Sequence, residues 1–315
     1  MNDSPCSPFV EMPRARWADL AAATSVVLNQ TTIDKLRGIG DPTSALDVQE
    51  VFHPLTELIS QQVRHAEQSW RDAAGYLGLA AGAVPFVVGI AGSVAVGKST
   101  VARLVAELLR RSHSHPQVAR VTTDGFLFDN ATLAARGLLD FKGFPETYDQ
   151  AAMLQFVVDV KSGRPAVPAP VYSHVIYDIE PGRHVVVDVP QILVLEGLNV
   201  LQPPPWPSPS GASAASVADL VDFSVYVDAD EAHIREWFVQ RFLELRSTAF
   251  TDPTSFFRQY ASLDDAGATA LARQIWDDIN GPNLRSYIAP TRERASVILR
   301  KGGDHRVESV SIRRV

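Results

Sequence analysis

The stretch Gly92-Ser93-Val94-Ala95-Val96-Gly97-Lys98-Ser99 fits the phosphate-binding pattern G-x-x-x-x-G-K-[S/T] at every fixed position. A loop that wraps a polyphosphate turns consecutive backbone N–H groups inward, and the two glycines permit the backbone angles and the close approach that this requires. In this pattern the lysine lies beside the β and γ phosphates, and the serine hydroxyl can ligate Mg²⁺. The stretch therefore predicts a site for a nucleoside triphosphate.

The residues on either side of this loop support the prediction. The apolar run 86–90 precedes it and is typical of a buried parallel strand. Residues 99–111 follow with apolar side chains at helical spacing, and the positive N-terminal end of such a helix would face the same phosphates. A chance turn of small residues would need all the fixed positions and this strand–loop–helix context to coincide.

Composition narrows the class of protein. The chain has 315 residues, of which 46% are hydrophobic and 21% charged, as in an ordinary globular protein. The formal net charge of −7 argues against a general nucleic-acid or anionic-membrane binder. Cys6 is the only cysteine, so neither an intrachain disulfide nor a cysteine zinc cluster is expected. We find no signal peptide and no apolar run long enough for a transmembrane helix, and we expect a cytoplasmic enzyme.

Residues 1–84 precede the nucleotide-binding core. Three prolines make the first dozen residues a predicted loose arm, and residues 14–28 a predicted short helix with Trp17 and Leu20 facing inward. Residues 47–77 carry an amphipathic helical pattern that Pro54 would break or kink near its start. This helix could serve a partner or a dimer, or it could cover the central sheet, and we favour the second interpretation.

Acidic residues follow two predicted strands of the core. Residues 118–123 end beside Asp124, and the apolar run 192–195 is closed by Glu196. Ligands of open parallel sheets lie at the carboxyl ends of the strands. Asp124 could orient a substrate hydroxyl or bind Mg²⁺ through water, or it could simply cap a turn. Glu196 has the position of an acid that holds Mg²⁺ in such proteins, although an ordinary strand can also end in a glutamate.

Hydrogen-bonding rings gather in the segment that follows the predicted helix 150–161. Tyr172, His174 and Tyr177 lie within six positions, in an extended segment that we expect to form an edge hairpin with residues 183–189. A single histidine is usually structural, and spacing alone does not decide the role of this cluster.

The last third of the chain predicts further helices and strands. A proline-rich exposed loop is expected at 203–216, a strand at 221–227, and a helix at 231–246 that Asp228 or Asp230 caps. That helix carries Arg235, Arg241 and Arg246, one of which could stabilise a transferring phosphoryl group, whereas a solvated charged face is the alternative. A helix at 264–280 and a hairpin of strands 295–299 and 306–312 complete the sheet.

These elements predict an α/β protein with the P-loop NTPase-type kinase fold, in which a central, mostly parallel sheet is flanked by helices. Residues 1–84 are expected to form an N-terminal helical extension packed on the core. Residues 85–315 are expected to form the kinase domain, a single globular unit.

Several segments together resemble the bacterial type I pantothenate kinases, in order and spacing, from about Trp17 to the C-terminus. They are Gly92–Thr100, Thr122–Phe126, Lys142–Asp149, Pro170–Asp178, Leu195–Asn199, Arg241–Pro253 and Pro290–Ala295. The resemblance implies ATP-dependent phosphorylation of the primary hydroxyl of pantothenate, the first step toward coenzyme A. It also implies Mg²⁺, a homodimer and feedback inhibition by coenzyme A.

The resemblance also implies roles for individual residues. Lys98 and Ser99 match the phosphate-loop lysine and the Mg²⁺ serine, Asp124 the catalytic acid, and Arg241 an arginine at the transferring phosphate. The positions that match the pantothenate pocket are Tyr172, His174, Tyr177, Phe238 and Asn280. Those that match positions near the phosphates and the pantetheine arm of bound coenzyme A are Lys98, Arg103, His174, Phe242 and Phe250.

One position departs from the resemblance. The family pattern has a tyrosine facing pantothenate where this chain has Phe238, so one substrate hydrogen bond is in doubt. Such a bond is worth about 0.5–1.5 kcal/mol, which would weaken binding several-fold without changing the reaction.

Two rival functions stay open on the residues alone. Another small-molecule kinase, for uridine or ribulose phosphate, would share the phosphate loop and a similar acid. A GTP-binding interaction protein usually carries an Asn-Lys-x-Asp motif, which is absent from this chain.

Overall fold

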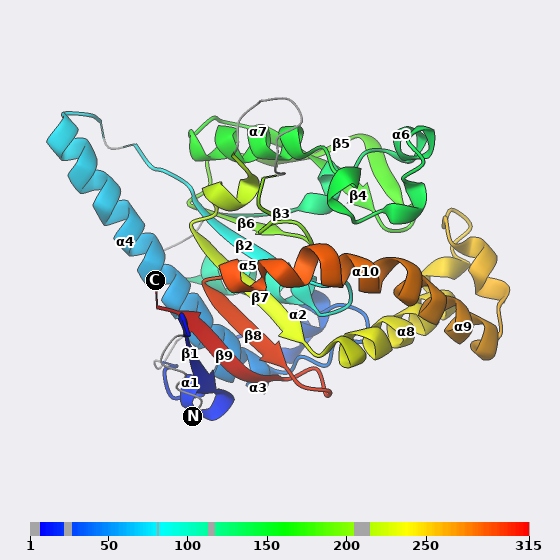
Figure 1. The fold of residues 1–315 in the computed structure, drawn as a ribbon. Helices are drawn as coiled ribbons and strands as arrows, with labels where there is room; N and C mark the ends of the chain where they lie inside the picture. Colours follow the sequence, from blue (N-terminus) through cyan, green and yellow to red (C-terminus); the bar gives the residue numbers. More distant parts are fainter. Residues whose placement is uncertain (1–6, 22–26, 81, 113–116, 205–214, 315) are drawn as a thin grey trace.

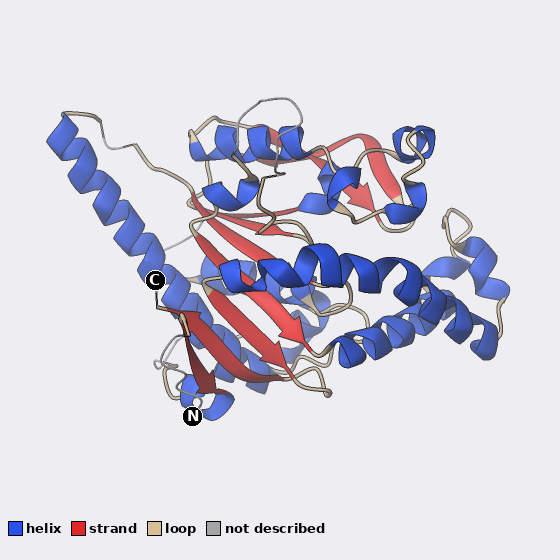
Figure 2. Ribbon diagram, in the orientation of Figure 1, coloured by secondary structure: helices blue, strands red, loops and turns tan. Residues whose placement is uncertain are grey.

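The computed structural model describes residues 7–21, 27–80, 82–112, 117–204 and 215–314. At its centre is a seven-stranded sheet in the order β1-β9-β8-β7-β2-β6-β3 (Figure 2). The strands are β1 (Phe9–Pro13), β2 (Phe86–Gly92), β3 (Val118–Thr122), β6 (Ile192–Glu196), β7 (Phe223–Ala229), β8 (Val297–Lys301) and β9 (Val307–Arg313). The strands from β8 to β3 pair in parallel, whereas β9 and β1 pair antiparallel. The predicted mostly parallel sheet is confirmed.

Helices cover both faces of this sheet, which explains its apolar central strands. Every residue of β2 and β6 is buried, as expected for strands that do not meet solvent on either face. Helix α5 (Lys98–Arg111) packs behind β2, β3 and β6, and the helical segment around α10 (Gly281–Asn283) crosses the front (Figure 1). The remaining short helices are α2 (Gln30–Leu36), α3 (Ala45–Asp47) and α6 (Asn130–Ala135).

The N-terminal segment differs from the expected loose arm. Residues 9–13 form β1, whose Met12 lies opposite Val310 of β9. An edge strand tolerates Pro13 because one of its sides has no ladder partner. Helix α1 spans only Arg14–Ala18, and its Trp17 is buried as predicted, with Nε1 donating to the Val51 carbonyl at 3.1 Å. Leu20 is exposed, so its predicted inward position was wrong.

The long amphipathic helix is confirmed. A π-helical turn at Val48–Phe52 leads into α4 (His53–Leu77), and Pro54 occupies the first turn of α4. Pro54 therefore starts the α-helix rather than breaking it, because the first turn needs no N–H donor. The first half of α4 is buried against the core, as predicted, but the second half projects from the body of the protein (Figure 1).

The predicted hairpin forms, but it does not join the edge of the main sheet. Strands β4 (Val167–Ser173) and β5 (Asp178–Val187) make a separate two-stranded sheet, with a bulge between Pro170 and Tyr172. Helix α7 (Gln150–Lys161) packs against β4 and was predicted with these bounds.

The C-terminal third follows the predicted order with two corrections. Helix α8 (Glu231–Ser247) receives no side-chain cap, because Asp228 and Asp230 instead form ion pairs with Arg300. The helix predicted to end at residue 280 begins with α9 (Asp265–Ile275) and continues through π-helical turns and α10 to Ile288. Residues 205–214 of the predicted proline-rich loop lie outside the described residues. Within the described part of the chain, no helix has the length and apolar character needed to cross a bilayer.

Candidate active site

The predicted phosphate loop connects β2 to α5 at the carboxyl edge of the sheet. Gly92 ends β2 with φ of 139°, and a Cβ added there would lie 2.5 Å from the carbonyl oxygen of Val227 in β7. Both the left-handed angle and the close approach require glycine. Gly97, with φ of 98°, then opens α5. The strand–loop–helix context that the pattern requires is present.

Three predicted site residues surround the loop lysine. Lys98 is 8% exposed, and its Nζ donates to the Ser93 carbonyl at 2.7 Å. Burial lowers the pKa of Lys98, while the carboxylates of Glu196 and Asp124 act to raise it and the Arg241 guanidinium lowers it further. Charged residues from three other elements therefore lie within electrostatic range of this one ammonium group.

A hydroxyl and a carboxylate meet where Mg²⁺ is predicted. Ser99 Oγ, in the first turn of α5, donates to Glu196 Oε1 at 2.7 Å. Hard oxygen ligands of this kind suit Mg²⁺, which usually takes its remaining ligands from phosphates and water. No cluster of three or more histidine, cysteine or acidic side chains that could hold a metal occurs among the described residues. The pair fits an ion that is completed by a bound polyphosphate.

Asp124 lies in a 3₁₀ turn, Thr123–Phe126, directly after β3. Its Oδ1 accepts from the Tyr148 hydroxyl at 3.4 Å, and burial followed by the Asp124 charge raises the pKa of Tyr148, so the phenol stays a donor. A Cβ added at Gly125 would lie 2.1 Å from the Pro170 carbonyl oxygen, so the turn touches β4 itself. Asp124 is thus held between the phosphate loop and the β4–β5 hairpin.

Of the three arginines on α8, only Arg241 faces the site. Arg235 pairs with Asp277 at 2.8 Å, and Arg246 pairs with Asp265. Arg241 donates no hydrogen bond within the described chain. Burial lowers its pKa, while Asp124 and Glu196 act to raise it.

Arg103 and Thr100 hydrogen-bond to the C-terminal end of α2 and to the residues that follow it. Arg103 Nε donates to the Leu36 carbonyl, and Thr100 Oγ1 accepts from Gly38 N at 3.0 Å. Burial, followed by Arg120, lowers the pKa of Arg103, while Glu196 acts to raise it, which places Arg103 beside the same charges as the loop.

The predicted ring cluster is brought together. The ring centroid of Tyr172 lies 5.2 Å from that of His174 and 6.2 Å from that of Tyr177. A residue that was not predicted as a site residue lies beneath these rings. Lys142 Nζ lies 4.3 Å from the Tyr177 centroid and donates to Asn130 Oδ1 at 2.6 Å and to the Tyr177 carbonyl. Lys142 belongs to a segment that carries the family resemblance, which is the one signal that could have indicated it.

Phe238 and Asn280 lie on neighbouring helices. The Phe238 ring is 5.8 Å from that of Trp276, and Asn280 ends the π-helical turn that Trp276 begins. Neither has a hydrogen bond or ring contact to Tyr172, His174 or Tyr177 within the described residues.

A chain of aromatic rings joins Tyr177, which the resemblance assigns to the pantothenate pocket, to Phe242 and Phe250, which it assigns to bound coenzyme A. Phe242 and Phe250 are buried with centroids 5.4 Å apart, Phe250 lies 5.2 Å from Phe257, and Phe257 lies 4.7 Å from Tyr177. Phe257 was not predicted as a site residue. It makes the apolar surface continuous from the Tyr177 ring to the Phe242 ring.

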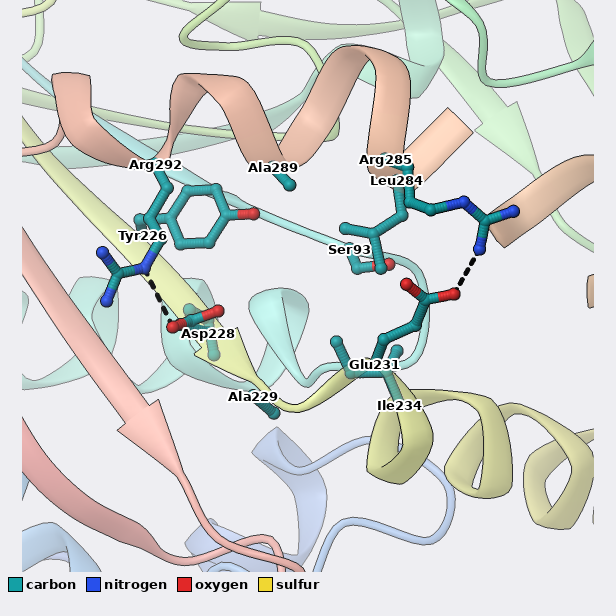
Figure 3. A pocket seen from close by; sticks show the side chains of 11 residues that line it. Ser93, Tyr226, Asp228, Ala229, Glu231, Ile234, Leu284, Arg285, Ala289 and Arg292 are labelled. Carbon is teal, nitrogen blue, oxygen red and sulfur yellow. Dashed lines mark hydrogen bonds and ion pairs between the residues drawn. The ribbon is translucent and has the colours of Figure 1, made fainter. Parts of the chain in front are cut away.

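A cavity of about 130 Å³ lies beside Ser93 of the phosphate loop (Figure 3). Ion pairs from Arg292 to Asp228 and from Arg285 to Glu231 flank it, and Ser93 and Tyr226 help to line it. Ligand pockets are usually about 300 Å³ or larger, so this cavity is too small for a nucleotide.

The sequence of this chain is similar to those of known small-molecule kinases. A sequence profile of the phosphoribulokinase / uridine kinase family matches residues 87–247. The pantothenate kinase of Cutibacterium acnes is 55% identical over 311 residues, which cover 98% of this chain and 95% of that protein. The pantothenate kinase of Brevibacillus brevis is 47% identical over 310 residues, with coverages of 98% and 97%. The chain belongs to the pantothenate kinase family.

Membership of the pantothenate kinase family confirms the resemblance seen in the sequence, and it makes the chain an ATP-using P-loop kinase of coenzyme A biosynthesis. Among solved structures, D-glycerate 3-kinase from Cryptococcus neoformans var. grubii is similar, with a TM-score of 0.55 and 13% identity over 80% of this chain and 97% of that one. At that identity the likeness shows the fold alone.

Proposed function

We propose that this enzyme transfers the γ-phosphoryl group of ATP to the primary hydroxyl of pantothenate, in the cytoplasm. The observation that carries the proposal is the set of groups at the carboxyl edge of the parallel sheet, where Ser99 Oγ donates to Glu196 Oε1 at 2.7 Å and the charges of Asp124, Glu196 and Arg241 act on Lys98. That edge is where ligands of such sheets bind. Whole-chain similarity to pantothenate kinases supports the choice of acceptor.

Asp124 orients the acceptor hydroxyl in the proposed mechanism. An aliphatic alcohol is a poor acid, but a loose transition state needs little proton removal before the phosphoryl group moves. Asp124 therefore positions the hydroxyl first and takes its proton late. The Tyr148 phenol, which donates to Oδ1 at 3.4 Å, leaves the other carboxylate oxygen for the substrate.

Lys98 and Arg241 stabilise the charge that spreads over the transferring group. Lys98 is buried and Arg241 is half-buried, and a cation in a water-poor site acts more strongly on developing charge than one in solvent. Ser99 and Glu196 would hold Mg²⁺, which neutralises phosphate charge when bound. The phosphates would be surrounded by the backbone N–H groups of Gly92-Ser93-Val94-Ala95-Val96-Gly97 and Thr100.

Tyr172, His174 and Tyr177 would form one wall of the pantothenate pocket, and Phe238 and Asn280 would complete it from the neighbouring helical segments Glu231–Ser247 and Trp276–Asn280. Three hydrogen-bonding rings suit a small substrate that carries hydroxyl, amide and carboxylate groups. Lys142 joins this group because its ammonium lies against the Tyr172 and Tyr177 rings.

Coenzyme A would inhibit by competing with ATP. Its phosphates would occupy the surroundings of Lys98 and Arg103, because a phosphate loop recognises phosphate oxygens and their charge. Its pantetheine arm would pass His174 and follow the aromatic chain toward Phe242 and Phe250. Two polyanions on one cationic loop repel strongly, so ATP and coenzyme A would exclude each other.

A homodimer would use the projecting half of α4. Tyr76 and Leu77 are 91% and 61% exposed at its end, and Leu79 follows at 54%. Exposed apolar groups on a helix that projects from the body are typical of an association surface.

An ADP-release assay with and without pantothenate tests the proposal. We expect release to depend on both ATP and pantothenate, and uridine or ribulose phosphate not to replace the latter. Equal release with uridine would contradict the assignment of the acceptor.

A further inference from the structure

Two buried amides converge on one backbone carbonyl next to the proposed pantothenate wall. Asn283 Nδ2 donates to the Gly143 carbonyl at 3.0 Å, and Asn199 Nδ2 donates to the same oxygen at 3.3 Å. The two asparagines are 2% and 4% exposed. No other donor reaches this oxygen among the described residues, so the amides alone satisfy it.

We propose that Asn199 and Asn283 are positioning residues that hold Lys142 against the Tyr172 and Tyr177 rings. The inference rests on the proposed function, because it assigns these rings to pantothenate. The amides can act on Lys142 because the Gly143 carbonyl that they bind belongs to the next residue in the chain. The planar peptide bond between Lys142 and Gly143 fixes one backbone relative to the other.

Lys142 in turn organises the turn that carries the rings. Its Nζ donates to the Tyr177 carbonyl and lies 3.5 Å from the Tyr172 hydroxyl. Tyr177 has φ of 54°, a left-handed angle that a tyrosine rarely adopts. Such an angle persists where surrounding contacts hold it. The Lys142 bond to the Tyr177 carbonyl is one of those contacts.

The two amides also join separate parts of the site. Asn199 follows β6, which ends at Glu196, and Asn283 lies in α10, just after Asn280. Asn199 thus lies three residues after Glu196, and Asn283 three residues after Asn280, so each is close in the chain to a proposed site residue. The Gly143 carbonyl therefore ties the Lys142 segment to the metal-site strand and to the helix at the pantothenate pocket.

Stability alone does not favour this arrangement. The Oδ1 atoms of Asn199 and Asn283 are buried and have no donor within the described part of the chain. An unpaired buried carboxamide oxygen destabilises a fold in a way that an apolar side chain of similar size would not. What the two asparagines contribute, and an apolar side chain would not, is the pair of Nδ2 hydrogen bonds to the Gly143 carbonyl.

The test compares Asn199→Ala and Asn283→Ala with Gln155→Ala, which removes an exposed amide from α7. We expect the KM for pantothenate to rise about tenfold or more in the first two variants, because small misplacements of binding groups are costly. The kcat should fall less than the KM rises, and the KM for ATP should change less than about twofold. Unchanged pantothenate KM in both variants would overturn the proposal.

A double-mutant cycle with Lys142→Met shows whether the amides act through Lys142 or whether their loss disturbs the fold more generally. If the amides act through Lys142, Asn283→Ala should add little to the pantothenate KM once Lys142 is replaced, because coupled residues are not additive. Full additivity in this cycle would mean that the amides do not act through Lys142, and the proposal would fall.

Binding of a fluorescent ATP analogue reports whether each variant is folded. If Asn283→Ala does not fold, Asn283→Asp keeps the shape without the donor, and Asn199→Ala tests the other amide. Wild-type enzyme that does not convert pantothenate would contradict the proposed function. Wild-type conversion with normal pantothenate KM in every asparagine variant would contradict only the role of the amides.

Discussion

The buried, protonated side chain of Lys142 should lower the free energy of unfolding of the enzyme at neutral pH. The side chain is 9% exposed, and burial lowers its pKa from 10.5 to about 8, although Asp178, Asp124 and Asp129 act to raise it. At about 1.4 kcal/mol for each pH unit, the difference between folded and unfolded chains corresponds to about 3 kcal/mol.

The sign of the pH dependence follows from proton binding. Between about pH 8 and 10.5 the unfolded chain binds a proton at Lys142 that the folded chain releases. The free energy of unfolding therefore rises with pH across this window, and below about pH 8 the full cost is present.

Lys142→Met removes this titration. We expect the free energy of unfolding of the wild type, minus that of Lys142→Met, to grow by about 3 kcal/mol between pH 7 and 10.5. Urea unfolding of both proteins, followed by tryptophan fluorescence, measures the difference, and Lys35→Met is the matched control at an exposed lysine. Parallel curves for wild type and Lys142→Met across this range would refute the reasoning.

Three further predictions concern the reaction and its inhibition. Lys98→Ala should abolish phosphoryl transfer and weaken ATP binding while circular dichroism stays normal, and near-normal turnover would contradict its assigned role. Asp124→Asn should lower kcat by about 10²-fold or more with ATP binding nearly unchanged, the usual effect of a positioned acid or base; a loss of ATP affinity with normal kcat would make Asp124 a metal or nucleotide ligand instead. Added ATP should relieve inhibition by coenzyme A, and Phe250→Ala should weaken coenzyme A roughly tenfold while ATP changes little, since a buried ring is worth about 1.5–3 kcal/mol. Inhibition that ignores ATP concentration, or that is unaltered in a folded Phe250→Ala enzyme, would remove this model of competition.

Much of the fold could be predicted because its signals are local. The buried runs of β2 and β6 and the amphipathic pattern of α4 each lie within one short stretch of chain, and burial on one or both faces produces such patterns. The missed features depend on distant partners. Residues 9–13 form a strand only because β9 offers its edge, and Asp228 leaves the helix cap because arginines of a later segment reach it.

The candidate site divides in the same way. Lys98, Ser99 and Glu196 could be predicted because a glycine-rich loop and the end of a buried strand mark them in sequence. Arg241 could not be separated from Arg235 and Arg246 by spacing, since all three lie on one helix, and only the contacts of the folded chain show which two are paired.

By itself, the sequence determined the phosphate loop, the order of the core elements and the family, because each depends on residue types at short spacing or on the succession of segments. Tertiary structure alone decided which side chains meet. It placed Lys142 under the Tyr177 ring, Phe257 between Tyr177 and Phe250, and two amides on the Gly143 carbonyl. The physical reason is that hydrogen bonds and ring contacts act over a few ångströms in space, whereas the residues that make them here are far apart along the chain.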